Sequence, residues 1–376
     1  MFNCFCKGRV QPIGLDIGHS SIKMIQLCQE GQAIHVAAAA DMPIDPALYS
    51  DPVIRKEFII SSIRRMYNQG GFNVRQTVSC LPSDIIRIRS LRLDSAALED
   101  IEQFMREDVA ARLGLDPEVD ELRYLVAGNI FHGEEIKTEV IFFGVDRTAL
   151  SDHIEMLEQA HLDPISIDTV PCALFRSFQR SLRRREDMNV ASVLVDLGSH
   201  FTTVIIGQGL QVIFIKQIPI AGEHLTQEIA SKLGIEPAEA AMLRSKLRDP
   251  QGGGLDEETT RAVTDAMNGM IEVLAREISL CFKYYAVTFR SQCPCEAVFA
   301  GGEVYESSLM DALRRHLDVK IRIAEPLRGF DLSRAKFNRR RNPQMCEWAV
   351  AVGLGLKGWE IPENTAEQPN VVQETV

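Results

Sequence analysis

Apolar and polar positions predict two halves with the same order of elements. In the first half, an apolar run ends at Asp16 and Gly18, and strand-like sequence continues to about Ala40. Apolar residues then recur at three- and four-residue steps over 52–69, which predicts a helix, and 77–81 is typical of the next strand. The first half therefore begins with three strands, a helix and a fourth strand.

The second half repeats this plan. Its first apolar run ends at Asp196 and Gly198, and another strand is predicted over 214–220. Two helices follow over 237–247 and 257–289, and the long apolar stripe of the second indicates burial. A further apolar run ends at Gly301-Gly302-Glu303, and the small apolar residues 349–356 predict a closely packed final helix.

Residues 85–162 differ from both halves, because their order of strand, helix, strand, strand and helix is typical of an inserted α+β subdomain. Its first helix is predicted over 95–113. The predicted domains are a first lobe (10–84 plus 163–187), the inserted subdomain (85–162), a second lobe (190–228 plus 296–358), a helical part of that lobe (229–295) and a disordered tail (359–376).

Composition narrows the class of protein. The chain has 376 residues, 45% of them hydrophobic and 25% charged, as in ordinary soluble domains. Its net charge of −11 argues against a broad nucleic-acid surface, since phosphate binding needs clustered cations. No apolar run approaches the length of a membrane span.

The two Asp-x-Gly turns carry the candidate chemistry. Glycine lets a backbone approach a ligand closely, and the N–H and hydroxyl groups of such a turn form an anion-binding concavity. An aspartate at the end of a strand can hold a magnesium ion. Two such turns indicate related halves that face each other across a phosphate.

These motifs resemble those of a known superfamily. Asp16-x-Gly18-x-x-x-x-Lys23, Asp196-x-Gly198-x-x-x-Thr202-Thr203 and Gly301-Gly302-Glu303 resemble the phosphate-1, phosphate-2 and adenosine motifs of actin-like ATPases. Within that superfamily, residues 10 to 358 resemble the PilM family of type IV pilus machines and are similar to the division protein FtsA. The resemblance implies an α/β, actin-like fold of two duplicated RNase H-like lobes, with the insertion in the first.

The resemblance also implies ATP and Mg²⁺ in a cleft between the lobes. Asp16 and Asp196 would hold the metal, and Lys23 would offset phosphate charge. The residues implied to contact the phosphates are Gly18, Ser20, Ser21, Gly198, Thr202 and Thr203. Those implied at the adenosine are Gly301, Gly302 and Glu303, and Gly222 and Arg244 are further implied nucleotide-binding residues. The best alignment puts Met242 and Arg244 where relatives often carry a glutamate and a lysine near the ribose.

The other polar residues do not indicate a further catalytic or binding site from the sequence. His19 stands where small residues are common in relatives, while His200 and His224, near turns, are typical of hydrogen-bonding bystanders. No general base for water attack is recognisable, so the catalytic residues are unknown and hydrolysis is expected to be slow at most.

The resemblance implies a cytoplasmic ATP-binding scaffold of a type IV pilus or related secretion machine. It would dock the cytoplasmic tail of a PilN-like inner-membrane protein in an ATP-coupled way and associate peripherally with the membrane through that partner. Contacts with other pilus machinery and self-association are further expectations. Two alternatives stay open: an FtsA-like membrane-associated filament former, although 364–376 has no amphipathic stripe, and a sugar-kinase-like phosphotransferase, although no acceptor pocket can be placed.

Overall fold

The computed structural model describes most of the chain, namely residues 9–31, 33–132, 135–182, 190–248, 254–335, 337 and 344–357. The predicted tail (359–376) and the end of the predicted first lobe (183–187) lie outside these residues. Within the described residues, no helix combines the length and the apolar character that a membrane span needs.

The first lobe is built on a five-stranded sheet with the order β3-β2-β1-β4-β8. Its strands are β1 (Arg9–Ile17), β2 (Ser21–Glu30), β3 (Ala33–Pro43), β4 (Gln76–Leu81) and β8 (Asp163–Thr169). Strand β1 is antiparallel to β2 and parallel to β4. Helices α1 (Pro52–Gly70) and α5 (Arg147–Gln159) contribute to one apolar core with β1 and β2. The last helix of the predicted insertion, α5, thus packs against the first lobe.

The second lobe has the same topology, β11-β10-β9-β12-β13. Its strands are β9 (Ala191–Leu197), β10 (Thr202–Gln208), β11 (Gln211–Ile218), β12 (Glu296–Ala300) and β13 (Lys320–Ile323). The helices that accompany this sheet are α7 (Gly222–Leu233), α8 (Pro237–Arg248), α9 (Glu257–Thr288) and α10 (Ser307–His316). Since the central strand of each sheet pairs antiparallel on one side and parallel on the other, the prediction of duplicated lobes is confirmed.

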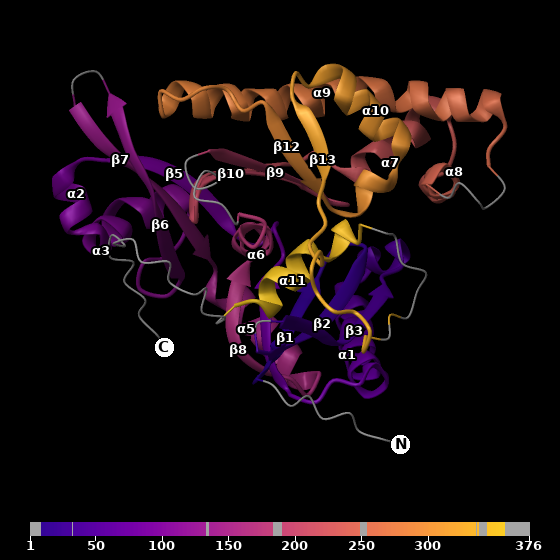
Figure 1. Ribbon diagram of the computed structural model, residues 1–376, viewed down its shortest axis with the longest axis horizontal. Helices are drawn as coiled ribbons and strands as arrows, with labels where there is room; N and C mark the ends of the chain where they lie inside the picture. Colours follow the sequence, from indigo (N-terminus) through magenta and orange to yellow (C-terminus); the bar gives the residue numbers. More distant parts are fainter. Residues whose placement is uncertain are drawn as a thin grey trace.

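Helices α6 (Val170–Gln179) and α11 (Ala349–Gly355) lie between the two sheets (Figure 1). The last helix returns to the first lobe and packs against β1 and α6. This approach requires glycine: a Cβ on Gly14 would lie 2.3 Å from the Ala351 carbonyl oxygen, and one on Gly353 would lie 1.7 Å from that of Ala173. The range 296–358 was predicted to belong to the second lobe, and its last helix therefore packs on the first lobe instead.

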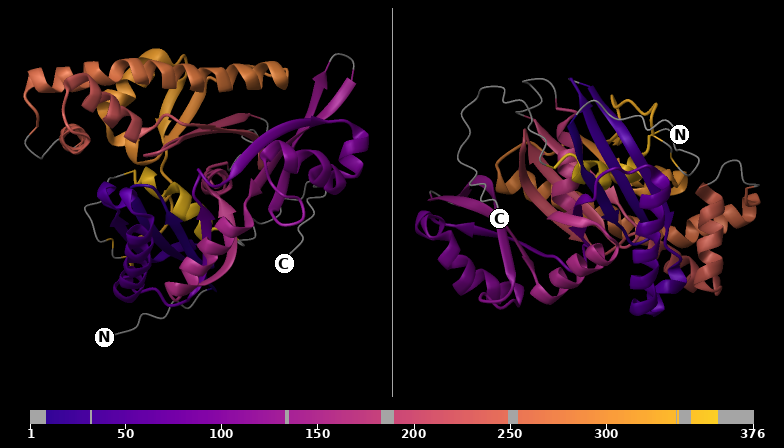
Figure 2. Two further views of the ribbon diagram at one scale, coloured as in Figure 1. Left: turned by 180° about the vertical axis from the view of Figure 1, so that it is seen from behind. Right: turned by 90° about the horizontal axis from the view of Figure 1, so that it is seen from below.

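The inserted subdomain has a three-stranded sheet of order β5-β7-β6, seen from two further sides in Figure 2. The strands are β5 (Arg87–Leu93), β6 (Glu121–His132) and β7 (Glu135–Val145). The single helix predicted over 95–113 is wrong. It is broken into α2 (Ser95–Glu99), α3 (Ile101–Phe104), a π-helical turn (Met105–Val109) and α4 (Ala110–Leu113). The Asp100 carboxylate accepts the Gln103 N–H and so caps a new helix start inside the expected one.

The inserted subdomain also contacts the second lobe. The buried Glu139 carboxylate of β7 accepts hydrogen bonds from the Tyr284 hydroxyl on α9 (3.1 Å) and from Arg92 Nε on β5 (3.3 Å). Nearby, Gln211 Nε2 of β11 donates to the Val126 carbonyl oxygen of β6 (2.6 Å). The subdomain therefore touches both lobes, and a change in their relative position would reach it.

The glycine contact of α11 can be tested with the same substitution at two helical sites. Gly353→Ala is expected to lower the free energy of unfolding by about 2–3 kcal/mol, because the new methyl group meets fixed backbone. In the control, Gly269→Ala in α9, the nearest atom is the mobile Lys232 Nζ at 3.7 Å, and better helix propensity should add about 0.5–1 kcal/mol. Urea unfolding measures both. Similar effects at the two sites would contradict the packing described.

Candidate functional site

A cavity of about 720 Å³ lies between the two lobes. The turn after β1 and the turn after β9 line it from opposite sheets, and the turn after β12 joins them. The cavity therefore gathers the three motifs that the sequence singled out. These predicted residues line it: Asp16, Gly18, Ser20, Ser21, Lys23, Asp196, Gly198, Thr203, Gly301, Gly302 and Glu303.

The turns after β1 and β9 have the same backbone geometry. The Gly18 N–H donates to the Ser21 carbonyl oxygen (3.0 Å), and the Gly198 N–H donates to that of Phe201 (3.1 Å). In each case the aspartate two residues earlier is the second-last residue of the central strand of its sheet. The sequence duplication is therefore a structural one, and it places a carboxylate, a glycine and polar backbone at one cavity from each side.

The third turn lies directly against the second. Strand β12 pairs with β9 so that Ala300 stands opposite Asp196. Gly301 has a φ of 94°, and a Cβ there would lie 2.2 Å from the Leu197 carbonyl oxygen. Only glycine fits this position, because it tolerates positive φ and leaves room for the neighbouring strand.

The two aspartates disfavour each other's charge. Burial raises the pKa of Asp16, opposed by Lys23, whose Nζ lies 3.9 Å from its carboxylate. Burial, and then the negative charge of Asp16, raise the pKa of Asp196 to about 7. A divalent cation between these carboxylates would offset both effects, so the donor set is suited to Mg²⁺, which binds oxygen ligands.

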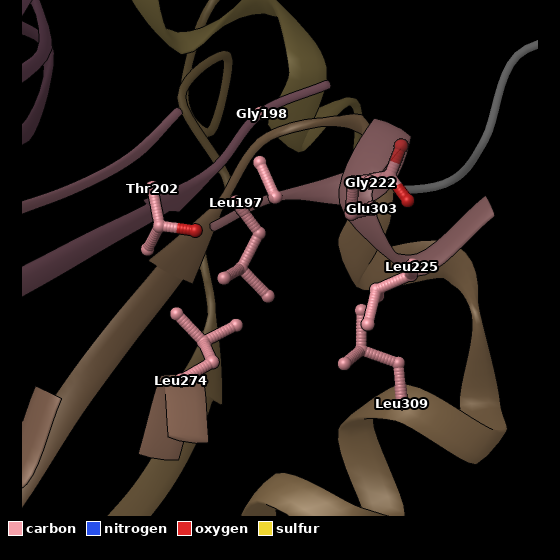
Figure 3. A pocket seen from close by; sticks show the side chains of 9 residues that line it. Leu197, Gly198, Thr202, Gly222, Leu225, Leu274, Glu303 and Leu309 are labelled. Carbon is pink, nitrogen blue, oxygen red and sulfur yellow. The ribbon is translucent and has the colours of Figure 1, made fainter. Parts of the chain in front are cut away.

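Three predicted residues do not line this cavity. The Thr202 hydroxyl donates to the Ile220 carbonyl oxygen (2.7 Å) and supports the turn from behind. Gly222 lies beside the Glu303 carboxylate, as Figure 3 shows, where a Cβ would be 2.3 Å from Glu303 Cδ. Both border a narrow neighbouring space whose other walls are mostly leucines: Leu197, Leu225, Leu274 and Leu309.

The third, Arg244, is only 3% exposed and holds two acidic side chains together. Its guanidinium lies 2.7 Å from a Glu303 oxygen and 2.5 Å from a Glu306 oxygen, and it also donates to the Gly222 carbonyl oxygen. Arg248 pairs with the same two glutamates. Because Glu303 lines the cavity, this ion-pair network fixes the position of one cavity wall, while Arg244 acts from behind it.

The structure brings further residues to the site. His19 and His200, from the two phosphate-motif turns, are stacked with ring centroids 4.7 Å apart and share the Glu223 carboxylate. Near the adenosine motif, the Tyr305 hydroxyl donates to the Glu347 carboxylate. In the sequence each histidine stood alone, 181 positions from the other, so no local pattern indicated their contact.

The raised pKa of Asp196 predicts a pH-dependent stability. Between about pH 4 and 7 the folded protein holds a proton that the unfolded chain has lost, so the free energy of unfolding falls as pH rises through this window. In buffer without nucleotide or divalent cation, Asp196→Asn should therefore raise the melting temperature above wild type at pH 8, and less so at pH 5. Scanning calorimetry measures both, with the exposed Asp311→Asn as control. A stabilisation equal at both pH values would contradict the assignment.

Comparisons with known proteins agree with this architecture. The sequence model of the family described as type IV pilus assembly protein PilM matches residues 14–359. Among solved structures, the chain is similar to one described as the PilM-PilN type IV pilus biogenesis complex, with a TM-score of 0.75, 20% identity, and coverage of 94% of this chain and 100% of that one. This likeness confirms the predicted actin-like fold.

Two further similarities are more distant. The ethanolamine utilization protein EutJ of Carboxydothermus hydrogenoformans has a TM-score of 0.54 at 15% identity, with coverage of 93% of this chain and 90% of that one. The cell division protein FtsA of Bacillus subtilis is 20% identical over 349 residues, or 84% of this chain and 78% of FtsA. Both alignments extend over the two lobes rather than over one motif.

Proposed function

The chain belongs to the type IV pilus assembly protein PilM family, and we propose that it is an ATP-binding scaffold whose nucleotide controls the docking of a membrane partner. The observation that carries this proposal is the pair of equivalent glycine turns, one from each lobe, facing one cavity. Such turns offer backbone N–H groups and hydroxyls to anions.

Different parts of the cavity are suited to different parts of a nucleotide. The turns around Gly18 and Gly198 would hold the phosphates, with Lys23 as a cation among them. The turn at Gly301 and Gly302 would approach the adenosine, and a side chain on Gly301 would collide with β9. Glu303, fixed by Arg244, would bound the adenosine side of the site.

Asp16 and Asp196 would hold the Mg²⁺ that accompanies ATP. The ion supplies positive charge between the phosphates and the two carboxylates. The protein's own contribution is geometric: β1 and β9 end at the same cavity, so both carboxylates can ionise together once a cation lies between them. The scaffold role requires binding rather than turnover, and we propose at most slow hydrolysis.

The proposed partner is the cytoplasmic tail of a PilN-like inner-membrane protein, because the similar solved structure is described as a PilM-PilN complex. The tail would dock at the inserted subdomain, and the chain would be held at the membrane from the cytoplasmic side. The contacts of Glu139 with Tyr284 and of Val126 with Gln211 connect that subdomain to the second lobe. A ligand that joins the lobes would thus also change the docking surface. To move the equilibrium between two arrangements of the lobes from 1:99 to 99:1, a ligand must bind one arrangement about 5.5 kcal/mol more favourably than the other.

Calorimetric titration with ATP–Mg²⁺ tests the nucleotide site. Wild type is expected to bind, and Asp196→Ala is expected to lose affinity at least roughly a hundred-fold, because one side of the cation site disappears. Asp311→Ala, on the exposed face of α10, is the matched control and should bind as wild type does. Unchanged binding by Asp196→Ala would contradict the site, and no binding by wild type would contradict the proposed function.

Coupling between nucleotide and partner is tested with a peptide of the partner's cytoplasmic tail. ATP should tighten peptide binding in wild type, with the reciprocal effect of peptide on ATP. Tyr284→Phe removes a hydrogen bond between α9 and the inserted subdomain and should reduce this coupling while leaving ATP affinity nearly unchanged. Tyr124→Phe, within the subdomain itself, is the control. Equal peptide affinity with and without ATP in wild type would contradict the coupling.

A further inference from the structure

A column of stacked side chains joins the two phosphate-motif turns. His19, one residue after Gly18, stacks on His200, two residues after Gly198, with 15° between the ring planes. Tyr49 stacks on His19 with ring centroids 3.9 Å apart, and the Arg55 guanidinium lies 4.9 Å from the Tyr49 ring centroid. All four residues line the cavity between the lobes.

One carboxylate oxygen holds both imidazoles. Glu223 Oε2 is hydrogen-bonded to His200 Nδ1 at 2.9 Å and lies within ion-pair distance of His19 Nε2, at 3.2 Å. Glu223 lies in the first turn of α7, and its own N–H donates to the Ser199 carbonyl oxygen in the turn after β9 (2.8 Å). The carboxylate is therefore held beside the two turns by backbone as well as by the histidines.

We propose that the Glu223 carboxylate occupies the place of a nucleotide's terminal phosphate, and that His19 and His200 exchange it for that phosphate when ATP binds. This inference rests on the proposed function. A nucleotide whose adenosine lies at Gly301 would reach the stacked column last, with the end of its phosphate chain. The histidine pair then distinguishes ATP from ADP, because only the longer chain displaces Glu223.

The charges around the column favour such an exchange. Burial lowers the pKa of His19; Glu223 and Asp84 oppose that shift, while His200 and Arg55 reinforce it. Tyr49, stacked on His19, and the His224 ring on α7, 5.9 Å from that of His200, are further titratable neighbours. A phosphate carries more charge than a carboxylate, so it stabilises protonated imidazoles better and makes charge-assisted hydrogen bonds to both.

The arrangement of the rings argues against a metal ion bound by the same three residues. A metal lies in the plane of each imidazole that binds it, because the nitrogen lone pair points along that plane. The two planes here are nearly parallel and stacked, so one ion cannot lie in both. The Coulombic attraction between a charged imidazole and an anion depends on their distance and requires no such common plane.

The test measures ATP and ADP binding, both with Mg²⁺, in matched variants. His19→Ala and His200→Ala should each weaken ATP binding roughly ten-fold while ADP binding stays as in wild type. Glu223→Gln should instead tighten ATP binding several-fold, because the competing negative charge is gone. His316→Ala, on α10, is the control. Equal losses for ATP and ADP, or weaker ATP binding by Glu223→Gln, would overturn the inference although the nucleotide site itself stands.

A second readout counts protons. Titrations in two buffers of different ionisation enthalpy give the number of protons bound with ATP. Wild type should take up more than the His19→Ala/His200→Ala double variant, and because both proteins keep Asp16 and Asp196, the difference reports the histidines alone. An equal number of protons in the two proteins would overturn the exchange. If wild type binds neither nucleotide, the proposed function fails first and the inference with it.

Discussion

The carboxylates of Asp16 and Asp196 impose the constraint on which the rest of the site depends. Each lies in the last two residues of the central strand of its own sheet, and the duplicated topology brings both to one cavity. There burial raises the pKa of both carboxyl groups, the negative charge of Asp16 raises that of Asp196 further, and Lys23 opposes both shifts. A site with two buried carboxylates and one lysine is suited to a cation, which is why the proposed ligand is a nucleotide with its Mg²⁺.

The remainder of the fold connects this cavity to the inserted subdomain. Helices α6 and α11 lie between the sheets and pack without room for a side chain at Gly353, so they form a close junction between the lobes. The inserted subdomain touches both lobes, through its own connections to the first and through Glu139 and Tyr284 to the second. A change in lobe position is therefore a change in the environment of the subdomain, which is what a nucleotide-controlled scaffold needs.

The repeated Asp-x-Gly pattern was sufficient to predict the duplicated lobes, because a strand end followed by a glycine turn is a local feature. The break at Asp100 was not predictable in the same way: apolar spacing stays helical through it, and only the cap shows the interruption. The position of Arg244 depends on Glu303, which lies 59 residues away. The contact of His19 with His200 likewise arises only when two separate lobes meet, so the sequence indicated His200 as a bystander and His19 only as a departure from relatives.

The most direct test of one ligand bridging both lobes is hydrogen–deuterium exchange with and without ATP–Mg²⁺. The backbone N–H groups of residues 16–23 and 196–203 belong to different sheets, yet both turns line the cavity. ATP–Mg²⁺ is expected to slow exchange in both segments together, and Asp196→Ala is expected to abolish protection in both. Protection of only one segment, or of neither at saturating nucleotide, would contradict it.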